Sequence, residues 1–199
     1  ILLSASSWQE FADSPTRQAR LRELVQMAHD RGIAVGVDAP FALIQQHAWH
    51  MVRETGSLHD ELAQIRSSID WLMAAGFDFL GGEMGTNEFM STEDTRMVEW
   101  MNEAARYLDE HYEGTRLYVK AHCSSGQKAQ HYVDPDTGEP LNYNFLAHYA
   151  DPRLAIMPHT VQFYGLDDPA PTYGNTDFGF MREFMQEEAG VREVRWYPE

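Results

Sequence analysis

The chain has 199 residues, of which 43% are hydrophobic and 23% are charged, so a globular protein with a substantial core is expected. Fifteen basic against 31 acidic side chains give a formal net charge of -16, which repels phosphate backbones and argues against a nucleic-acid partner. No apolar run approaches the roughly 18 to 20 residues of a membrane span, and a single cysteine excludes an internal disulfide. We therefore expect a soluble, acidic protein without nucleic-acid or membrane partners.

One unit recurs along the chain: an amphipathic helix, a turn, and a short strand that ends in a polar residue. The first predicted helix begins at Ser14-Pro15, a cap residue followed by proline, and ends at Gly32. The run 33–37 follows as a strand buried on both faces, and Asp38 ends it.

The next two units repeat this order. A helix beginning near residue 58 ends at Gly76 and leads into the apolar run 77–80. Ser91 with Asp94 three residues on resembles a capping box, so a helix is predicted from there to Gly114. Residues 117–119 form the third clear strand.

The last part of the chain contains two further strands. A long polar segment and a short helix near 145–149 precede a strand at 154–157, and a helix at 178–189 precedes a strand at 191–197. At the other end, residues 1–3 are predicted to be the tail of an earlier strand. The sequence thus predicts five clear strands and one partial strand.

The spacing of these units indicates the fold class. The turns that enter the strands lie at intervals of 44, 38, 38 and 38 residues, and such regular alternation predicts parallel strands with helical crossovers. An open doubly wound sheet and a (β/α)₈ TIM barrel both fit. The barrel is favoured, because no strand is followed by a G-x-G-x-x-G loop and polar residues follow several successive strands.

A complete barrel takes about 250 residues, so we expect an incomplete α/β barrel holding about strands 2 to 7. Residues 1–199 would form a single domain of this kind, as part of a longer chain. The missing units would leave open strand edges, and the 199-residue piece alone is therefore expected to be poorly stable or prone to aggregate.

Polar residues at the strand ends mark the expected site, because the loops after parallel barrel strands meet at one mouth. The glycine-rich stretch after the second clear strand carries two carboxylates. The residues at the strand ends are Asp38, Glu83 with Glu88, Lys120 with His122, His159, and Glu199.

These residues resemble a family, the retaining glycoside hydrolases of the (β/α)₈ superfamily called clan A. Asn87-Glu88 after one strand, His159 followed by Tyr164 two units later, and Glu199 after the next strand carry the resemblance. In that clan an Asn-Glu pair ends strand 4 and supplies the acid/base, and a Glu ending strand 7 is the nucleophile. Here Gly82-Glu83 stands at the strand end instead, and Asn87-Glu88 follows five residues later.

The resemblance implies cleavage of a glycosidic bond in a small-molecule or oligosaccharide substrate by a two-carboxylate retaining mechanism, without a cofactor. That mechanism needs one protonated and one ionised carboxyl group about 5 to 5.5 Å apart. Glu199 would be the nucleophile, and Glu83 or Glu88 the acid/base. The predicted substrate-binding residues are Asp38, Asn87, Lys120, His122, His159 and Tyr164.

Two other functions fit the same barrel. His122 and His159, with Asp38, Glu83 and Lys120 nearby, could hold a divalent metal such as zinc in an amidohydrolase-like hydrolase. A barrel that binds carbohydrate without catalysis would differ mainly in the distance between its two glutamates. Cys123 beside His122 is interpreted as a small packed residue rather than a nucleophile.

Overall fold

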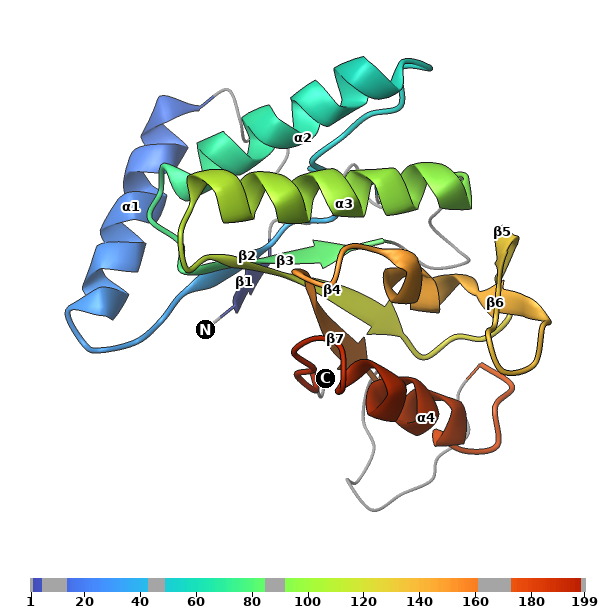
Figure 1. Cartoon of the computed structure of the whole chain (residues 1–199). Coiled ribbons are helices and arrows are strands. Elements are labelled where there is room, and N and C mark those ends of the chain that lie inside the picture. Colours follow the sequence, from blue (N-terminus) through green and yellow to red (C-terminus); the bar gives the residue numbers. More distant parts are fainter. Residues whose placement is uncertain (1, 5–13, 43–48, 85–91, 161–172, 198–199) are drawn as a thin grey trace.

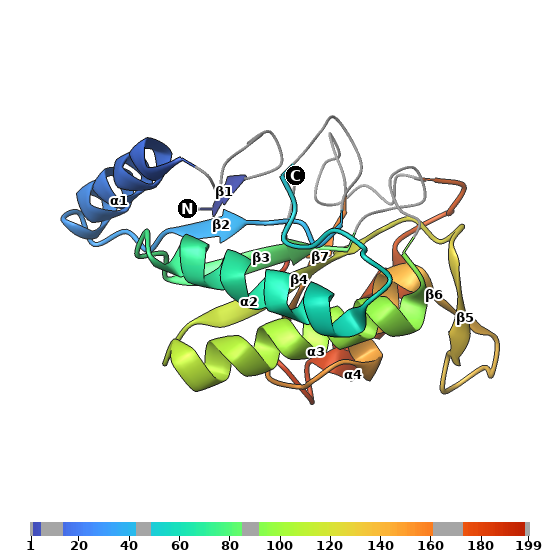
Figure 2. The same cartoon turned by 90° about the horizontal axis from the view of Figure 1, so that it is seen from above.

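A computed structural model describes residues 2–4, 14–42, 49–84, 92–160 and 173–197. Its main element is a five-stranded parallel sheet in the order β1-β2-β3-β4-β7 (Figures 1 and 2). Each strand pairs in parallel with its neighbour, as the alternation of helices and strands predicted. The strands are β1 (Leu2–Ser4), β2 (Gly36–Asp38), β3 (Phe79–Glu83), β4 (Arg116–His122) and β7 (Ala155–His159).

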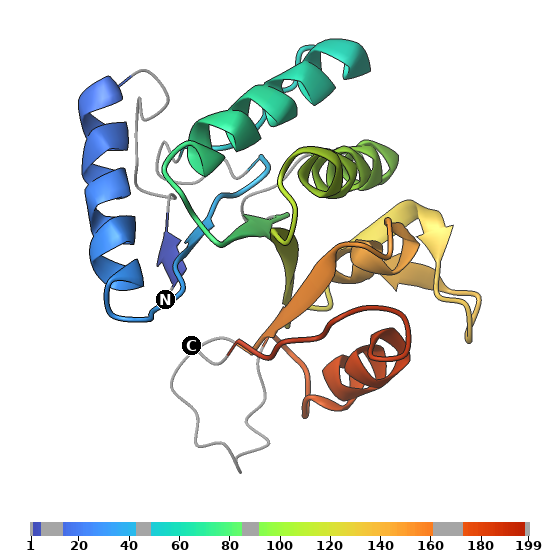
Figure 3. The same cartoon turned by 60° about the vertical axis from the view of Figure 1, so that its left-hand side comes forward.

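The helices lie on the outer side of the curved row of strands (Figure 3). They are α1 (Pro15–His29), α2 (Leu58–Met73), α3 (Asp94–His111), α4 (Gly179–Glu188) and the 3₁₀ helix η3 (Tyr143–Tyr149). A curved parallel sheet covered by helices on its outer side is the arrangement of a (β/α)₈ barrel, and the expected incomplete barrel is confirmed. No helix within the described residues has the length and apolar character needed to cross a membrane.

Local sequence explains where the helices begin. Ser14 caps α1 by accepting a hydrogen bond from the Arg17 N–H, and proline follows as predicted. The predicted capping box at Ser91 is wrong: α3 begins at Asp94, and its N-cap is Glu93. The carboxylate of Glu93 accepts the Arg96 N–H at 3.1 Å, a bond that satisfies one of the free donors of the first turn.

The segment after α4 extends the row of strands. Val194 forms a parallel bridge with Ile156, and Tyr197 forms one with His159. The predicted strand 191–197 is thus reduced to two isolated bridges, but its direction is parallel to β7. The end of this segment therefore reaches the same side of the sheet as the end of β7.

A two-stranded hairpin was missed by the sequence analysis. The long polar segment after β4 contains β5 (Lys128–Val133) and β6 (Pro140–Asn142), which pair antiparallel. The hairpin projects at the end of the molecule opposite to α1 (Figures 1 and 2). Most residues of β5 are exposed, so this strand lacks the apolar alternation by which a half-buried strand is recognised.

The two faces of the sheet have different contents, as strand β4 illustrates. Leu117, Val119 and Ala121 lie in the large core between sheet and helices. Tyr118 lies in a separate small cluster with residues of β7. Because successive strand residues point to opposite faces, Lys120 and His122 share the inner face with Tyr118.

Glycine on the inner face makes room for large neighbours. A Cβ atom at Gly36 would lie 2.2 Å from Cε2 of Phe79, so the Phe79 ring occupies the space where that side chain would be. The Phe79 ring also meets Tyr118 edge to face, with centroids 5.7 Å apart. Aromatic rings therefore fill the inner face below the strand ends.

Candidate active site

The register of the sheet brings the strand ends together at one mouth. Glu83 pairs with Lys120 across β3 and β4, and His122 pairs with His159 across β4 and β7. His159 in turn pairs with Tyr197. Since all these strands are parallel, their carboxyl ends lie on the same side of the sheet.

Lys120 forms the electrostatic centre of the mouth. Its Nζ atom lies 2.5 Å from Oδ2 of Asp38 and 3.8 Å from Oε2 of Glu83. The same nitrogen lies 5.0 Å from the centre of the Tyr197 ring, within range of a cation–π contact. Burial alone would lower the pKa of Lys120, but the charges of Asp38 and Glu83 outweigh it and raise this pKa. Lys120 is therefore a fixed cation at neutral pH, not a free amine.

Asp38 is held in a tight environment at the end of β2. The residue is 4% exposed, and its Oδ2 accepts from Lys120, whereas Oδ1 is buried without a hydrogen-bond partner among the described residues. A Cβ atom at Gly81 on the neighbouring strand would lie 3.1 Å from that Oδ1. Glycine at position 81 therefore provides the space for the Asp38 carboxylate.

A group of rings forms the other half of the mouth. His122 and His159 are both buried, and their ring centroids lie 5.4 Å apart. The ring centroid of Tyr173 lies 5.0 Å from that of His122, and the ring centroid of Tyr197 lies 5.3 Å from that of His159. Nδ1 of His122 accepts the backbone N–H of Ser124 at 3.0 Å.

Together these groups offer hydrogen-bond partners and ring faces side by side. The two carboxylates, Asp38 and Glu83, outnumber the one ammonium group, Lys120, in the described part of the mouth. Hydroxyl groups can donate to the carboxylates and accept from the ammonium, and ring faces can cover apolar surface. The arrangement therefore suits an uncharged polar ligand.

The structure brings together five of the residues that the sequence predicted for the site: Asp38, Glu83, Lys120, His122 and His159. The other four, Asn87, Glu88, Tyr164 and Glu199, lie outside the described residues.

Tyr197 was missed as a site residue. It lies two positions before Glu199, and the two-residue period of a strand places alternate residues on the same face, so this signal was present in the sequence.

Cys123 is a buried residue of the core, as interpreted from the sequence. Burial raises the pKa of its thiol to about 11. A thiol that stays protonated at neutral pH is a poor nucleophile, so this cysteine contributes volume rather than reactivity.

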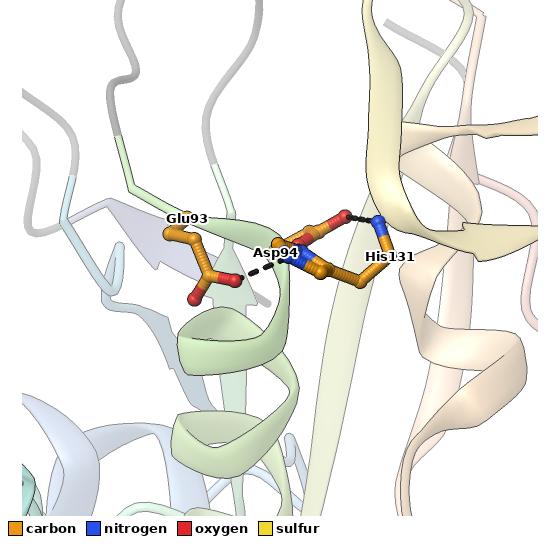
Figure 4. Close-up of side chains that lie close together, drawn as sticks. All are labelled: Glu93, Asp94 and His131. Atoms are coloured by element: carbon orange, nitrogen blue, oxygen red, sulfur yellow. Dashed lines mark hydrogen bonds and ion pairs between the residues drawn. The ribbon is translucent and has the colours of Figure 1, made fainter.

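A second cluster of charged groups lies where the β5–β6 hairpin meets the start of α3. Nδ1 of His131 lies 2.6 Å from Oδ1 of Asp94 and 3.0 Å from Oε1 of Glu93 (Figure 4). The buried Asp94 also accepts the backbone N–H groups of Gln130 and His131. Among the described residues, only these three offer His, Cys, Asp or Glu ligand atoms that all lie within 4.8 Å of one another, as the ligands of a metal ion would. Their hydrogen bonds connect the hairpin to the helix.

Comparisons with known proteins establish the fold. No protein-family model matches the chain, and no curated protein matches it either. Among solved structures, it resembles a sugar phosphate isomerase/epimerase from Parabacteroides distasonis ATCC 8503, with a TM-score of 0.51 and 9% identity over 98% of this chain and 89% of that one. A second sugar phosphate isomerase/epimerase from the same organism gives a TM-score of 0.52 and 10% identity over 90% of this chain and 70% of that one.

A glycoside hydrolase is also among the structural neighbours. CpGH84B, of glycoside hydrolase family 84, gives a TM-score of 0.51 and 14% identity over 73% of this chain. The chain spans 24% of the length of CpGH84B. At these identities the likeness establishes a shared TIM-barrel fold.

Proposed function

We propose that this chain belongs to the catalytic barrel of a glycoside hydrolase that cleaves its substrate by a two-carboxylate retaining mechanism. The proposal takes the strand-end mouth as the active site and an oligosaccharide or smaller glycoside as the substrate. It uses carboxyl groups of the chain and requires no metal or organic cofactor.

The observation that carries the proposal is the position of Lys120 between two strand ends. Its ammonium group contacts Glu83 on one side and the ring of Tyr197 on the other. Tyr197 is two residues before Glu199 in a segment that runs parallel to β7. This relation supports a pair of carboxylates, one after β3 and one after the last strand segment, at a single mouth.

In the proposed reaction Glu199 attacks the anomeric carbon, and the glycosidic oxygen takes a proton from the acid/base residue as its bond to that carbon breaks. Water then hydrolyses the glycosyl–enzyme ester, with the acid/base residue removing a proton from the water. Asp38, His122, His159, Asn87 and Tyr164 are proposed to bind hydroxyl groups of the substrate.

The cation beside Glu83 weighs against Glu83 as the acid/base residue. A cation 3.8 Å from Glu83 stabilises the ionised form of its carboxyl group, whereas the first step of the reaction needs a protonated one. Glu83 is better suited to hold Lys120 in place and to accept a hydrogen bond from a sugar hydroxyl. We therefore propose Glu88 as the proton donor and Glu83 as a substrate-binding residue.

The test is hydrolysis of a panel of p-nitrophenyl α- and β-glycosides of the common hexoses and pentoses, with the anomeric configuration of the first-formed product followed by proton NMR. The proposal expects turnover of at least one glycoside with retained configuration. Inverted configuration would overturn the double displacement, and a panel without any turnover would overturn the glycosidase assignment.

A further inference from the structure

We propose that a groove on the outer side of the barrel binds an uncharged oligosaccharide, separately from the mouth. The groove lies between α3 and the turn that leads from η3 into β7, and its volume is about 460 Å³, within the range of small-molecule sites. Its lining includes Glu99, Asn102, Arg106, Tyr149 and Pro152. The proposal goes beyond hydrolysis, because this site would hold a sugar without cleaving it.

An exposed tyrosine ring of fixed orientation forms one wall of the groove. Tyr149 is 38% exposed. Its hydroxyl group donates to the carbonyl oxygen of Val133 at 2.6 Å, and its ring centroid lies 4.7 Å from that of Tyr132. Both partners belong to β5, so the hairpin orients the ring before a ligand binds, and binding needs little further ordering. Such a ring can cover the apolar C–H face of a pyranose.

Asn102 contributes a hydrogen-bond donor whose orientation is fixed by the backbone. The N–H of Asp151 donates to Oδ1 of Asn102 at 2.7 Å, and only the oxygen of an amide group can accept, so this bond identifies the other atom as Nδ2. Nδ2 makes no hydrogen bond in the part of the chain that the structure describes. A hydroxyl or ring oxygen of a sugar can accept a hydrogen bond from it.

The charges around the groove are largely paired, which favours an uncharged ligand over an ion. The guanidinium group of Arg106 donates to the carboxylate of Glu103, and that of Arg153 donates to the carboxylate of Asp151. Glu99 is exposed and forms no ion pair with a described residue, so its carboxylate is available to accept from a hydroxyl group. A carbohydrate, whose hydroxyl groups both donate and accept, complements an amide donor, a carboxylate acceptor and a ring face.

The groove is distant from the mouth. Helix α3 lies on the outer side of the sheet (Figure 3). The turn at 150–152 comes before Ala155, the first residue of β7, whereas His159 at the other end of β7 lies in the mouth. The length of β7, roughly 15 Å at about 3.3 Å per residue, separates the two places. Substitutions in the groove therefore leave the groups of the mouth unchanged.

NMR spectroscopy of the backbone amides tests the site without requiring enzymatic activity. The Glu199→Gln chain, which lacks the proposed nucleophile, would be titrated with cellotetraose, xylotetraose, maltotetraose and chitotetraose. We expect at least one of them to shift the amide signals of Asn102 and Tyr149 saturably, with a Kd of about 1 mM or tighter. No saturable shift at these amides with any of the four would overturn the proposal, and so would shifts confined to the strand ends.

Two substitutions distinguish a binding role from a structural one. Asn102→Asp keeps an oxygen for the Asp151 N–H but removes the donor, and should weaken binding at the groove about fivefold. Tyr149→Ala removes the ring and should weaken binding by about tenfold or more, whereas Tyr149→Phe keeps the ring and should stay within about threefold.

The amide signals of the mouth show whether each variant remains folded. Unchanged affinity at the groove in both Asn102→Asp and Tyr149→Ala would overturn the proposal. A chain without glycosidase activity would contradict the proposed function but leave this measurement unaffected.

Discussion

The ammonium nitrogen of Lys120 lies 2.5 Å from Oδ2 of Asp38, although 82 positions separate the two residues in the chain. Both side chains are largely buried, with 11% and 6% exposure. A buried pair of this kind does little for stability compared with apolar residues, but it is costly to break, because the remaining charge loses its partner. Lys120 thus links the ends of β2 and β4.

Replacing Lys120 by Met should lower the free energy of unfolding by about 3 kcal/mol, because the buried carboxylate of Asp38 is left without its cation. Urea unfolding followed by circular dichroism measures this change. The matched control is Asp38→Asn, which leaves Lys120 its contact with Glu83 and should cost less. The loss of unfolding free energy in the double variant should be smaller than the sum of the two single losses, by at least about 1 kcal/mol. Additive effects would show that the two side chains are not coupled.

The strand ends could be predicted because the physics behind them is local and repetitive. A strand buried on both faces is recognisable from its β-branched and apolar residues, and parallel topology then dictates where Asp38, Lys120 and His159 meet. The pairing itself was not predictable. Asp38 contacts Lys120 two strands away because Gly81, on the strand between them, leaves room for its carboxylate, and that depends on register.

Substrates with different leaving groups should distinguish Glu88 from Glu83 as the acid/base residue. Glu88→Gln should reduce kcat/KM by about 10²- to 10⁴-fold on alkyl glycosides, whose leaving oxygen needs a proton. The same variant should retain most of its kcat/KM on 2,4-dinitrophenyl glycosides, whose leaving group departs as an anion, because kcat/KM reports the first step alone. Its kcat on these substrates should fall, because the second step loses its general base. Glu83→Gln should lower activity on both substrates to the same extent. The reverse pattern would assign the proton donor to Glu83.

Stability should depend on pH through His131. Its hydrogen bond to Asp94, with the charges of Asp94 and Glu93, raises the pKa of His131 above the ordinary histidine value of 6.5. A raised pKa in the folded state means that the protonated ring favours folding. This stabilisation is complete below about pH 6.5 and is lost as the pH rises through the folded-state pKa.

Thermal unfolding between about pH 6 and 9 measures this effect. The Tm of the unmodified chain should fall as the pH rises. His131→Gln should remove the part of this pH dependence of Tm that comes from His131. Asp94 stays ionised over this range: burial alone would raise its pKa, but its hydrogen bonds with His131 and Gln130 lower it. His59→Gln is the control, because His59 is exposed and its ring contacts the carboxylate of the adjacent residue, Asp60. Equal slopes for both variants would contradict the assignment.

Gly36→Ala should destabilise the barrel by about 1 to 3 kcal/mol, the usual cost of overfilling a packed interior. The new methyl group would collide with the Phe79 ring, which must then move against Tyr118. Gly190→Ala is the matched control, since the nearest atom to its Cβ among the described residues would be the Glu187 carbonyl oxygen, at 3.8 Å. Chemical denaturation of both variants measures the difference, and equal stabilities would show that the inner face has spare room.

Two parts of the candidate site depend on contacts that no local pattern specifies. The Nδ1 partner of His122 is the backbone of Ser124, which is held by asparagines from the β6–η3 region. The Glu93, Asp94 and His131 cluster likewise requires the β5–β6 hairpin, whose mostly exposed strand β5 gave no clear signal. Such long-range polar contacts are decided by tertiary structure rather than by periodicity.

The most direct test of the central claim is to trap the proposed covalent intermediate. The chain would be incubated with 2,4-dinitrophenyl 2-deoxy-2-fluoro-glycosides that match the hydrolysed substrates, digested, and mapped by mass spectrometry, with Glu199→Gln as the control. We predict one fluoroglycosyl group, attached to Glu199 and absent from the control. An adduct on any other residue, or hydrolysis of the parent glycoside without an adduct on Glu199, would contradict the account.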